Sequence, residues 1–178
     1  MSLSDDALIV RCLKNDQEAG RELFVRYALF LYRLAHRTTL NQALAEEISQ
    51  EAWLKIFQKL DQYQMGTSFR AWSAAICYNL CVDHLRKAQS QQSLDHATLR
   101  QIMHPRRLMP AEYAEENELL QSVLDKLHNL PEVFRTAFSL RYIEEMDYEE
   151  IADVMGCATG TARTRVFRAA QLCREQFA

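Results

Sequence analysis

The sequence predicts an all-α protein built as two small helical domains joined by a flexible linker. Apolar residues recur every three to four positions along most of the 178-residue chain, and no segment alternates apolar and polar residues as a half-buried strand would. Only four glycines and three prolines interrupt the chain, and 48% of its residues are hydrophobic, which is enough to form apolar cores. The periodicity fades after Lys87 and resumes near Leu119, so the linker is expected between these positions.

Four helices are expected in the first lobe, each preceded by a residue that can cap a helix N-terminus. Ser4, Asp16, Asn41 and Ser68 each stand immediately before a run with helical apolar spacing. The run after Asn41 has apolar residues at every fourth position from Leu44 to Leu60. A helix with that stripe buries one side and leaves the other to solvent or to a partner.

The segment 89–116 is expected to be the linker, because it is rich in Gln and Ser and has no sustained apolar face. It also contains Pro105 and Pro110, which oppose a continuous helix. If fully extended, it would reach on the order of 100 Å at about 3.3–3.6 Å per residue. In the second lobe, Pro131 suits the first position of a helix.

Near the C-terminus the sequence predicts two helices around a tight turn. Asp147 and Glu150 have the spacing of a capping box, and Gly156 suits the left-handed position that ends a helix. The next helix is expected to start at Ala158 or Thr159, with its small apolar residues facing inward. Its outward residues are then Thr161, Thr164, Arg165 and Arg168, flanked by Arg163 and Phe167. This pattern indicates a DNA-binding helix-turn-helix, with an ordinary helical hairpin and a solvated basic face as the alternative.

Charge is distributed unevenly along the chain. The whole protein has a net charge of -3, residues 118–155 carry a net charge of about -6, and residues 156–178 carry about +3. Phosphate contacts supply much of the affinity of a protein for duplex DNA. A mostly acidic chain with one basic helix should therefore bind DNA poorly alone and need a larger partner.

Several other functions are disfavoured. The five cysteines are odd in number and scattered, which favours a reducing cytoplasm over a disulfide framework. No apolar run is long enough for membrane insertion, and the N-terminus lacks the pattern of a signal peptide. Cys77, Cys81 and His84 share a helix face, but no fourth metal ligand is evident nearby. We expect no metal, no cofactor and no enzymatic activity.

The segment LPEVFRTAFSLRYIEEMDYEEIADVMGCATGTARTRVFRA resembles region 4 of the extracytoplasmic-function (ECF) group of bacterial sigma factors. The resemblance implies that the last helix of this segment reads the −35 promoter element. The residues then expected to contact DNA are Thr161, Arg163, Thr164, Arg165, Phe167 and Arg168.

The segment ALAEEISQEAWLKIFQKLDQY is similar to the acidic helix with which that family docks on the β′ clamp helices of RNA polymerase. The resemblance assigns this contact to Glu46, Glu47, Gln50, Glu51 and Leu54. By charge alone, the same acids would fit an ordinary solvated helix face.

The segment YQMGTSFRAWSAAICYNLCVDHLRK resembles the part of region 2 that opens and reads the −10 element. A loop from 63 to 68 with a flexible glycine could receive an extruded base, and polar residues of the next helix could face DNA. Without the resemblance, Phe69 and Trp72 are better explained as core residues. The expected −10 contacts are Tyr63, Gly66, Ser68, Phe69, Asn79, Asp83, Arg86 and Lys87.

The resemblance implies region 2 at 1–88, a linker at 89–116 and region 4 at 117–178. The implied function is that of an ECF sigma factor that directs promoter recognition, promoter opening and transcription initiation. Its implied partners are promoter DNA, an anti-sigma factor, and the β′ clamp helices and β flap of core RNA polymerase. Two alternatives stay open: a stand-alone helix-turn-helix regulator, and an interaction protein that sequesters a sigma factor or polymerase without touching DNA.

Overall fold

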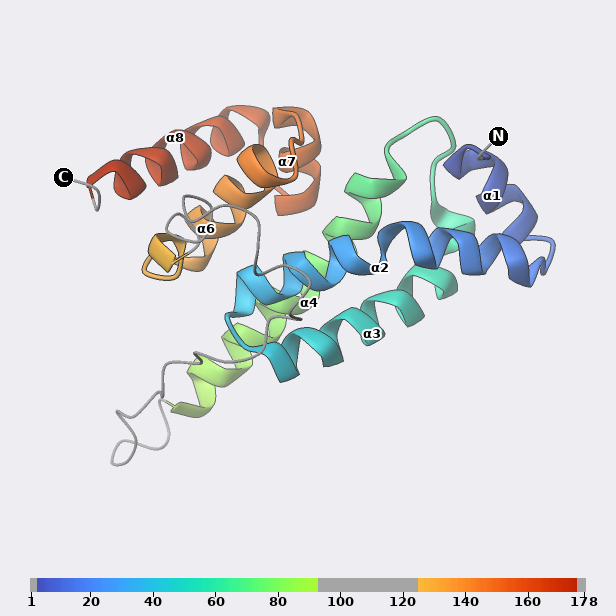
Figure 1. The fold of residues 1–178 in the computed structure, drawn as a ribbon, viewed down its shortest axis with the longest axis horizontal. Coiled ribbons are helices and arrows are strands. Elements are labelled where there is room, and N and C mark those ends of the chain that lie inside the picture. Colours follow the sequence, from blue (N-terminus) through green and yellow to red (C-terminus); the bar gives the residue numbers. More distant parts are fainter. Residues whose placement is uncertain (1–2, 93–124, 176–178) are drawn as a thin grey trace, which may run out of the picture.

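The computed structural model describes residues 3–92 and 125–175, and every regular element in those ranges is helical (Figure 1). The elements in chain order are α1 (Asp5–Cys12), α2 (Gln17–Thr39), α3 (Gln42–Gln58), the 3₁₀ turn η1 (Leu60–Gln62), α4 (Phe69–Gln92), α6 (Glu132–Phe138), the π-helical turn η3 (Ser139–Ile143), α7 (Tyr148–Met155) and α8 (Thr159–Glu175). Helix α4 continues four residues past the expected end of the first domain at 88, and most of the expected linker lies outside the described residues.

The four N-caps expected from the sequence are confirmed. The Ser4 hydroxyl accepts a hydrogen bond from the backbone N–H of Ala7, and the Asp16 carboxylate accepts from Glu18 and Ala19. The Asn41 side chain accepts from the N–H of Leu44 at 3.0 Å, and the Ser68 hydroxyl accepts from Ala71 at 3.2 Å. Each bond satisfies a backbone donor that the first helical turn leaves unpaired.

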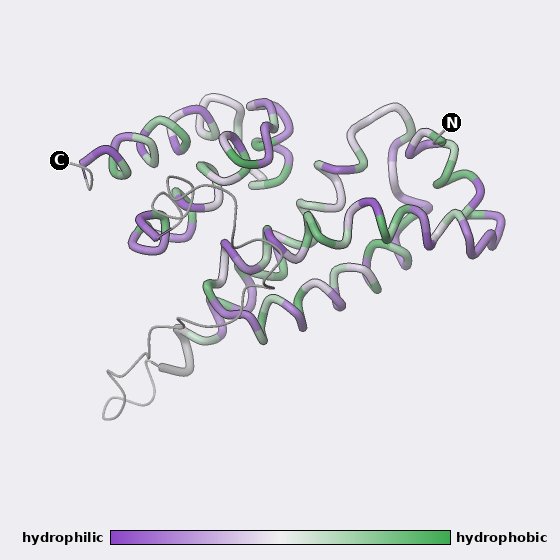
Figure 2. The backbone as a smooth tube through the Cα atoms, in the orientation of Figure 1, coloured by the Kyte–Doolittle hydropathy of each residue, from purple (hydrophilic) through white to green (hydrophobic). Residues whose placement is uncertain are grey.

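Helices α2, α3 and α4 form the core of the first lobe, with α1 packed against α2. Hydrophobic and hydrophilic residues alternate along the helices (Figure 2), and the buried hydrophobic ones form the core between them. The fully buried large side chains of this lobe are Leu8, Ile9, Leu23, Leu31, Ile48, Ile56 and Phe69. This core gives α3 and α4 fixed positions, with their polar sides outward.

The second lobe consists of α6, η3, α7 and α8. Asp147 and Glu150 form the expected capping box, in which each side chain accepts a hydrogen bond from the backbone N–H of the other residue. Gly156 ends α7 with φ at 60°, a left-handed conformation that glycine adopts at little cost. Ala162 and Val166 of α8 are buried as expected.

The two lobes pack directly against each other (Figure 1). Helix α4 of the first lobe contacts α7 of the second, and α2 contacts α6. Buried residues of both lobes, among them Leu31, Ala74, Leu140 and Ile151, belong to one continuous apolar cluster. The periodicity predicted each lobe, but not their shared core.

Two histidines lie close enough to interact electrostatically, the half-buried His36 near the end of α2 and the largely exposed His128 in the turn before α6. Burial lowers the pKa of His36, and the charges of His128 and Arg37 lower it further, while the ring of Tyr32 stacks on its imidazole. Burial and Arg135 also lower the pKa of His128, opposed by Asp125. The neutral imidazole is therefore favoured in the folded protein, mainly at the half-buried His36 and less at His128, which is more exposed to solvent.

Acidification should destabilise the protein through this pair. The stability that comes from neutral histidines is present above their ordinary pKa of 6.5, and it is lost as the pH falls through the lowered pKa values of the folded state. Urea unfolding between about pH 7.5 and 5.5, above the range of ordinary carboxylates, should show a falling free energy of unfolding. The double variant His36→Gln/His128→Gln should show a flatter dependence, and an equally steep one would contradict this assignment.

The capping box of α7 should contribute measurably to stability. Asp147→Ala removes the acceptor for the Glu150 N–H and should cost about 0.5–2 kcal/mol of unfolding free energy. The matched control is Asp153→Ala, which removes an exposed carboxylate from the same helix without removing a cap. Urea denaturation of both variants measures the two losses of unfolding free energy. Equal losses would show that the cap stabilises the protein no more than an exposed carboxylate does.

Candidate DNA-binding and partner-binding surfaces

Helix α8 presents a polar face on the side opposite its buried alanines. Thr161, Arg163, Thr164, Phe167 and Arg168 are exposed, with 64% of Phe167 accessible to solvent, and Arg165 is half-buried. The residues that the sequence assigned to the −35 contact therefore lie together along one accessible side of the helix.

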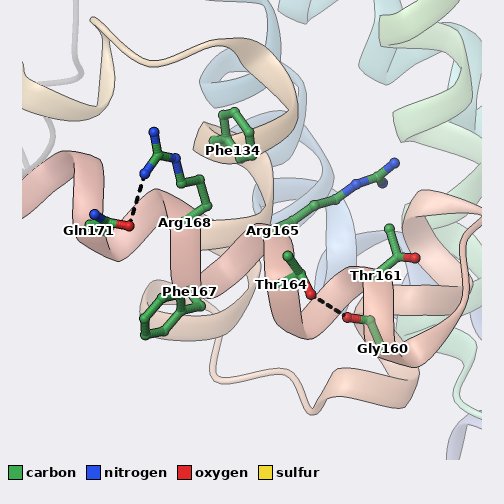
Figure 3. Close-up of a pocket in the computed structure, with 8 residues that line it drawn as sticks. All are labelled: Phe134, Gly160, Thr161, Thr164, Arg165, Phe167, Arg168 and Gln171. Atoms are coloured by element: carbon green, nitrogen blue, oxygen red, sulfur yellow. Dashed lines mark hydrogen bonds between the residues drawn. The ribbon is translucent and has the colours of Figure 1, made fainter.

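An open groove of about 460 Å³ runs along this face (Figure 3). Phe134 of α6 lies between the side chains of Arg165 and Arg168, and the groove is also lined by Gly160, Thr161, Thr164, Phe167 and Gln171. Phe134 and Gln171 were not expected from the sequence. Gln171 lies one turn beyond the arginine row, so helical spacing could have found it, whereas Phe134 comes from another helix.

Several side chains of this face are held in place by their neighbours. The Arg168 guanidinium donates to the side-chain oxygen of Gln171 at 2.9 Å, and the Thr164 hydroxyl donates to the carbonyl of Gly160 at 2.9 Å. The guanidinium of Arg163 lies 5.0 Å from the centre of the Tyr148 ring, a cation–π contact. Arginines on an exposed helix at this spacing can reach base edges and phosphates in a major groove.

The loop before α4 is anchored to the first helix. Gly66, with φ at 82°, donates its N–H to the Asp6 carboxylate at 2.9 Å. The Tyr63 hydroxyl donates to the carbonyl of Thr67, and the Ser68 hydroxyl donates to Glu150 of the second lobe at 2.7 Å. The anchoring role of Asp6 was not expected, because it depends on a contact sixty residues away in sequence.

The expected −10 residues divide into a buried and an exposed set. Tyr63 and Phe69 are buried, and their rings pack edge to face with centroids 5.7 Å apart. On α4, Asn79 and Lys87 are exposed, while Arg86 forms an ion pair with Asp83 at 2.8 Å. The exposed set forms a polar strip along α4 that an extended ligand can reach, and the buried set shapes the loop beside it.

Helix α3 presents an acidic face with one apolar residue. Glu46, Glu47, Gln50 and Leu54 are exposed, and 64% of Leu54 is accessible to solvent. Glu51 is half-buried, pairing with Lys55 at 2.9 Å and lying 3.5 Å from His84, and the Lys55 hydrogen bond lowers the pKa of the Glu51 carboxyl.

Beside this acidic face lie two partly exposed aromatic residues that were not expected from the sequence. Phe24 and Phe57 both pack on Trp53, with ring centroids 5.0 and 5.5 Å away, and both remain more than 40% exposed. The acidic face therefore continues into an apolar surface on the same side of the lobe.

The cysteines considered as metal ligands have a structural role in the core. Cys77 and Cys81 are buried in α4, and the Cys77 thiol donates to the carbonyl of Leu31. Within residues 3–92 and 125–175, no group of three or more His, Cys, Asp and Glu residues is placed to hold a metal ion. No helix in the same ranges combines the length and apolarity needed to cross a membrane.

Comparison with known proteins relates both lobes to one family. Sigma-70 region 2 matches residues 23–91, and Sigma-70, region 4 matches residues 120–173. The ECF RNA polymerase sigma-E factor of Escherichia coli (strain K12) is 33% identical over 179 residues, covering 94% of this chain and 91% of that protein. The ECF RNA polymerase sigma factor SigW of Bacillus subtilis (strain 168) is 28% identical over 170 residues, covering 92% and 91%. None of these relatives is named as an enzyme.

Two solved structures are similar to the fold. The sigma factor RpoE of Bartonella quintana, in complex with the anti-sigma factor NepR, superimposes with a TM-score of 0.73 and 26% identity over 87% of this chain and 94% of that one. CnrH, in complex with the cytosolic domain of CnrY, superimposes with a TM-score of 0.70 and 20% identity, covering 97% of this chain and 96% of that one. At this low identity, the similarity supports the assignment of the fold and nothing more. With the helix-turn-helix, the acidic helix and these relatives together, the chain belongs to the ECF group of RNA polymerase sigma factors.

Proposed function

We propose that α8 holds the −35 duplex while the first lobe docks on core RNA polymerase and captures the opened −10 strand. The observation that carries this proposal is the exposed arginine row of α8 beside the open groove. The row belongs to the second helix of a helix-turn-helix, the element that enters the major groove in such motifs. In this assignment Thr161, Arg163, Thr164, Arg165, Phe167 and Arg168 contact bases or phosphates.

Core RNA polymerase supplies the remaining affinity. The net charge of -3 opposes binding of the isolated protein to DNA, and the acidic face of α3 suits a basic partner. Glu46, Glu47, Gln50, Glu51 and Leu54 contact the β′ clamp helices, and the second lobe contacts the β flap. Two modest DNA contacts on one scaffold then reinforce each other through effective concentration.

The −10 strand follows the polar strip of α4. Asn79, Asp83, Arg86 and Lys87 contact its bases and phosphates, and the loop from 63 to 68 receives an extruded base. Because Tyr63 and Phe69 are buried, we assign them to shaping this loop rather than to stacking on bases. Gly66 and Ser68 supply the turn and a hydroxyl at its rim.

We also propose how the chain divides into regions, where the protein acts and what controls it. Region 2 occupies 1–88, the linker 89–116 and region 4 117–178. The protein acts in the cytoplasm as a non-enzymatic subunit, because it works with the transcribing enzyme. An anti-sigma factor controls it, a proposal supported by the similarity to a sigma factor solved with its anti-sigma factor.

Run-off transcription with purified core polymerase tests this function. Adding the protein should produce transcripts from discrete start sites, with a common element near −35 and another near −10. The isolated protein should bind the same duplexes weakly, with affinity falling as salt increases. Tight binding of a palindromic duplex by the free protein, without any response to core polymerase, would instead indicate a stand-alone regulator.

Arg168→Ala tests the assignment of α8. If Arg168 contacts a base edge, the variant should lose about 1–3 kcal/mol, or roughly 5- to 150-fold, in promoter binding by the holoenzyme. The matched control is Arg174→Ala, which removes an exposed arginine from the same helix beyond the groove. The loss should disappear on promoters whose −35 element is scrambled. Equal losses on both promoters would assign Arg168 to a phosphate.

A further inference from the structure

The loop between η1 and α4 is held partly by hydrogen bonds of its own. The backbone N–H and the hydroxyl of Thr67 donate to the carbonyl of Gln64 at 3.3 and 2.7 Å, and the Tyr63 hydroxyl donates to the carbonyl of Thr67 at 2.5 Å. These bonds close the loop into a turn. The N–H of Gly66, in the exposed part of the loop, has its partner outside the loop.

Asp6, in the first turn of α1, is that partner. One oxygen of its carboxylate accepts the N–H of Gly66 at 2.9 Å, and the other oxygen lies 3.3 Å from the Tyr63 hydroxyl. A single side chain therefore contacts both the beginning and the middle of the loop. Gly66 has a φ of 82°, and because glycine populates other conformations readily, the bond to Asp6 helps to select this one.

The first turn of α1 is itself fixed, so Asp6 can serve as an anchor. The neighbouring Asp5 carboxylate pairs with Arg26 of α2 at 2.5 Å and accepts a hydrogen bond from the Tyr27 hydroxyl. Leu8 of the same helix is fully buried in the core. Asp6 therefore holds the loop from a rigid helix that is packed against the rest of the lobe.

The core side and the exposed side of the loop have different properties. The buried ring of Tyr63 packs edge to face on Phe69 and Trp72, with centroids 5.7 and 5.5 Å away. The exposed residues of the loop are Gln64, Met65, Gly66 and Thr67. The backbone is thus held from the core side, while the outer side chains remain accessible to a ligand. A pocket for an extruded base needs this combination of fixed shape and access.

A simpler role for Asp6 is to stabilise α1, because an acid in the first turn interacts favourably with the helix dipole. Asp5 lies in the same turn and has the same charge, whereas the contacts with Gly66 and Tyr63 are made by Asp6. The two roles can be separated by an amide. Asp6→Asn removes the charge but keeps an oxygen that can accept the Gly66 N–H. A dipole role therefore predicts that Asp6→Asn and Asp6→Ala behave alike, and an anchoring role predicts that they differ.

We propose that Asp6 is a positioning residue for base capture, which holds the loop from 63 to 68 in the conformation that receives the extruded −10 base and thereby sets the selectivity for that base. The inference rests on the proposed function. A loop that is already ordered does not lose conformational entropy when the base enters. It also discriminates between bases, because a base that fits poorly leaves polar groups of the fixed pocket unpaired. Asp6 does not touch the DNA in this assignment and acts through Gly66 and Tyr63.

Promoter opening on altered −10 elements tests this role. Each −10 position is substituted in turn, and the permanganate reactivity of unpaired thymines measures opening by the holoenzyme. Asp6→Ala should reduce the discrimination at one −10 position by roughly 2- to 10-fold, the worth of one exposed hydrogen bond. Discrimination at the −35 element should not change, and Asp6→Asn should retain most of the wild-type selectivity. The matched control Asp61→Ala removes an exposed carboxylate from η1, and therefore the same charge, and should behave as the wild type.

A second variant alters the same turn from the side of the loop. Gly66→Ala finds no atom within 4 Å of its new Cβ, but alanine disfavours a φ of 82°. It should therefore weaken discrimination at the same −10 position as Asp6→Ala. Loss at a different position would contradict a shared role of the two residues.

Two results would overturn the proposal. One is a loss of opening that is equal on all promoters, and the other is equal behaviour of Asp6→Asn and Asp6→Ala. Hydrogen–deuterium exchange of the free protein tests the anchor without transcription: Asp6→Ala should speed exchange in the segment 63–68, and an unchanged rate would show that Asp6 does not hold the loop. If the wild type opens no promoter with core polymerase, the proposed function is wrong and the role in base capture fails with it, whatever the exchange rates show.

Discussion

The side chain of Arg135 joins the two halves of this molecule. Its guanidinium lies at the carboxyl end of α2 and takes up two backbone carbonyls that the helix cannot pair by itself. A charge this deeply buried is costly unless it is fully hydrogen-bonded, and here three carbonyls from both lobes meet that need. The position of α6, and through it of α7 and α8, therefore depends on the end of a helix in the other lobe.

Charge is separated between surfaces with different tasks. The acidic face of α3 suits a basic protein partner, whereas the arginine row lies on α8. An ECF sigma factor with this distribution has little attraction for DNA in general. In the proposed function, it gains affinity when the polymerase holds both candidate DNA-binding surfaces on one promoter.

Local features account for the part of the fold that could be predicted. The caps at Ser4, Asp16 and Asn41, the turn at Gly156 and the inward positions of Ala162 and Val166 follow from interactions within about four residues along a helix. Such interactions need no knowledge of the rest of the chain. The outward face of α8 follows from the same spacing, and the family resemblance supplied the meaning of that face and of the acidic helix.

Distant contacts account for the remainder. Nothing in the local pattern around Arg135 or Glu144 distinguishes them from surface charges. Arg135 becomes buried, and Glu144 becomes mostly shielded from solvent, only because this part of the second lobe packs against α2 and α4. The burial of Tyr63 and Phe69 and the position of Phe134 beside α8 likewise depend on which helices pack together. The sequence alone thus determined where the helices form, which of their residues face inward or outward, and which family the chain resembles. The packing of one lobe on the other specified which charges are hidden, because burial depends on three-dimensional neighbours that periodicity does not encode.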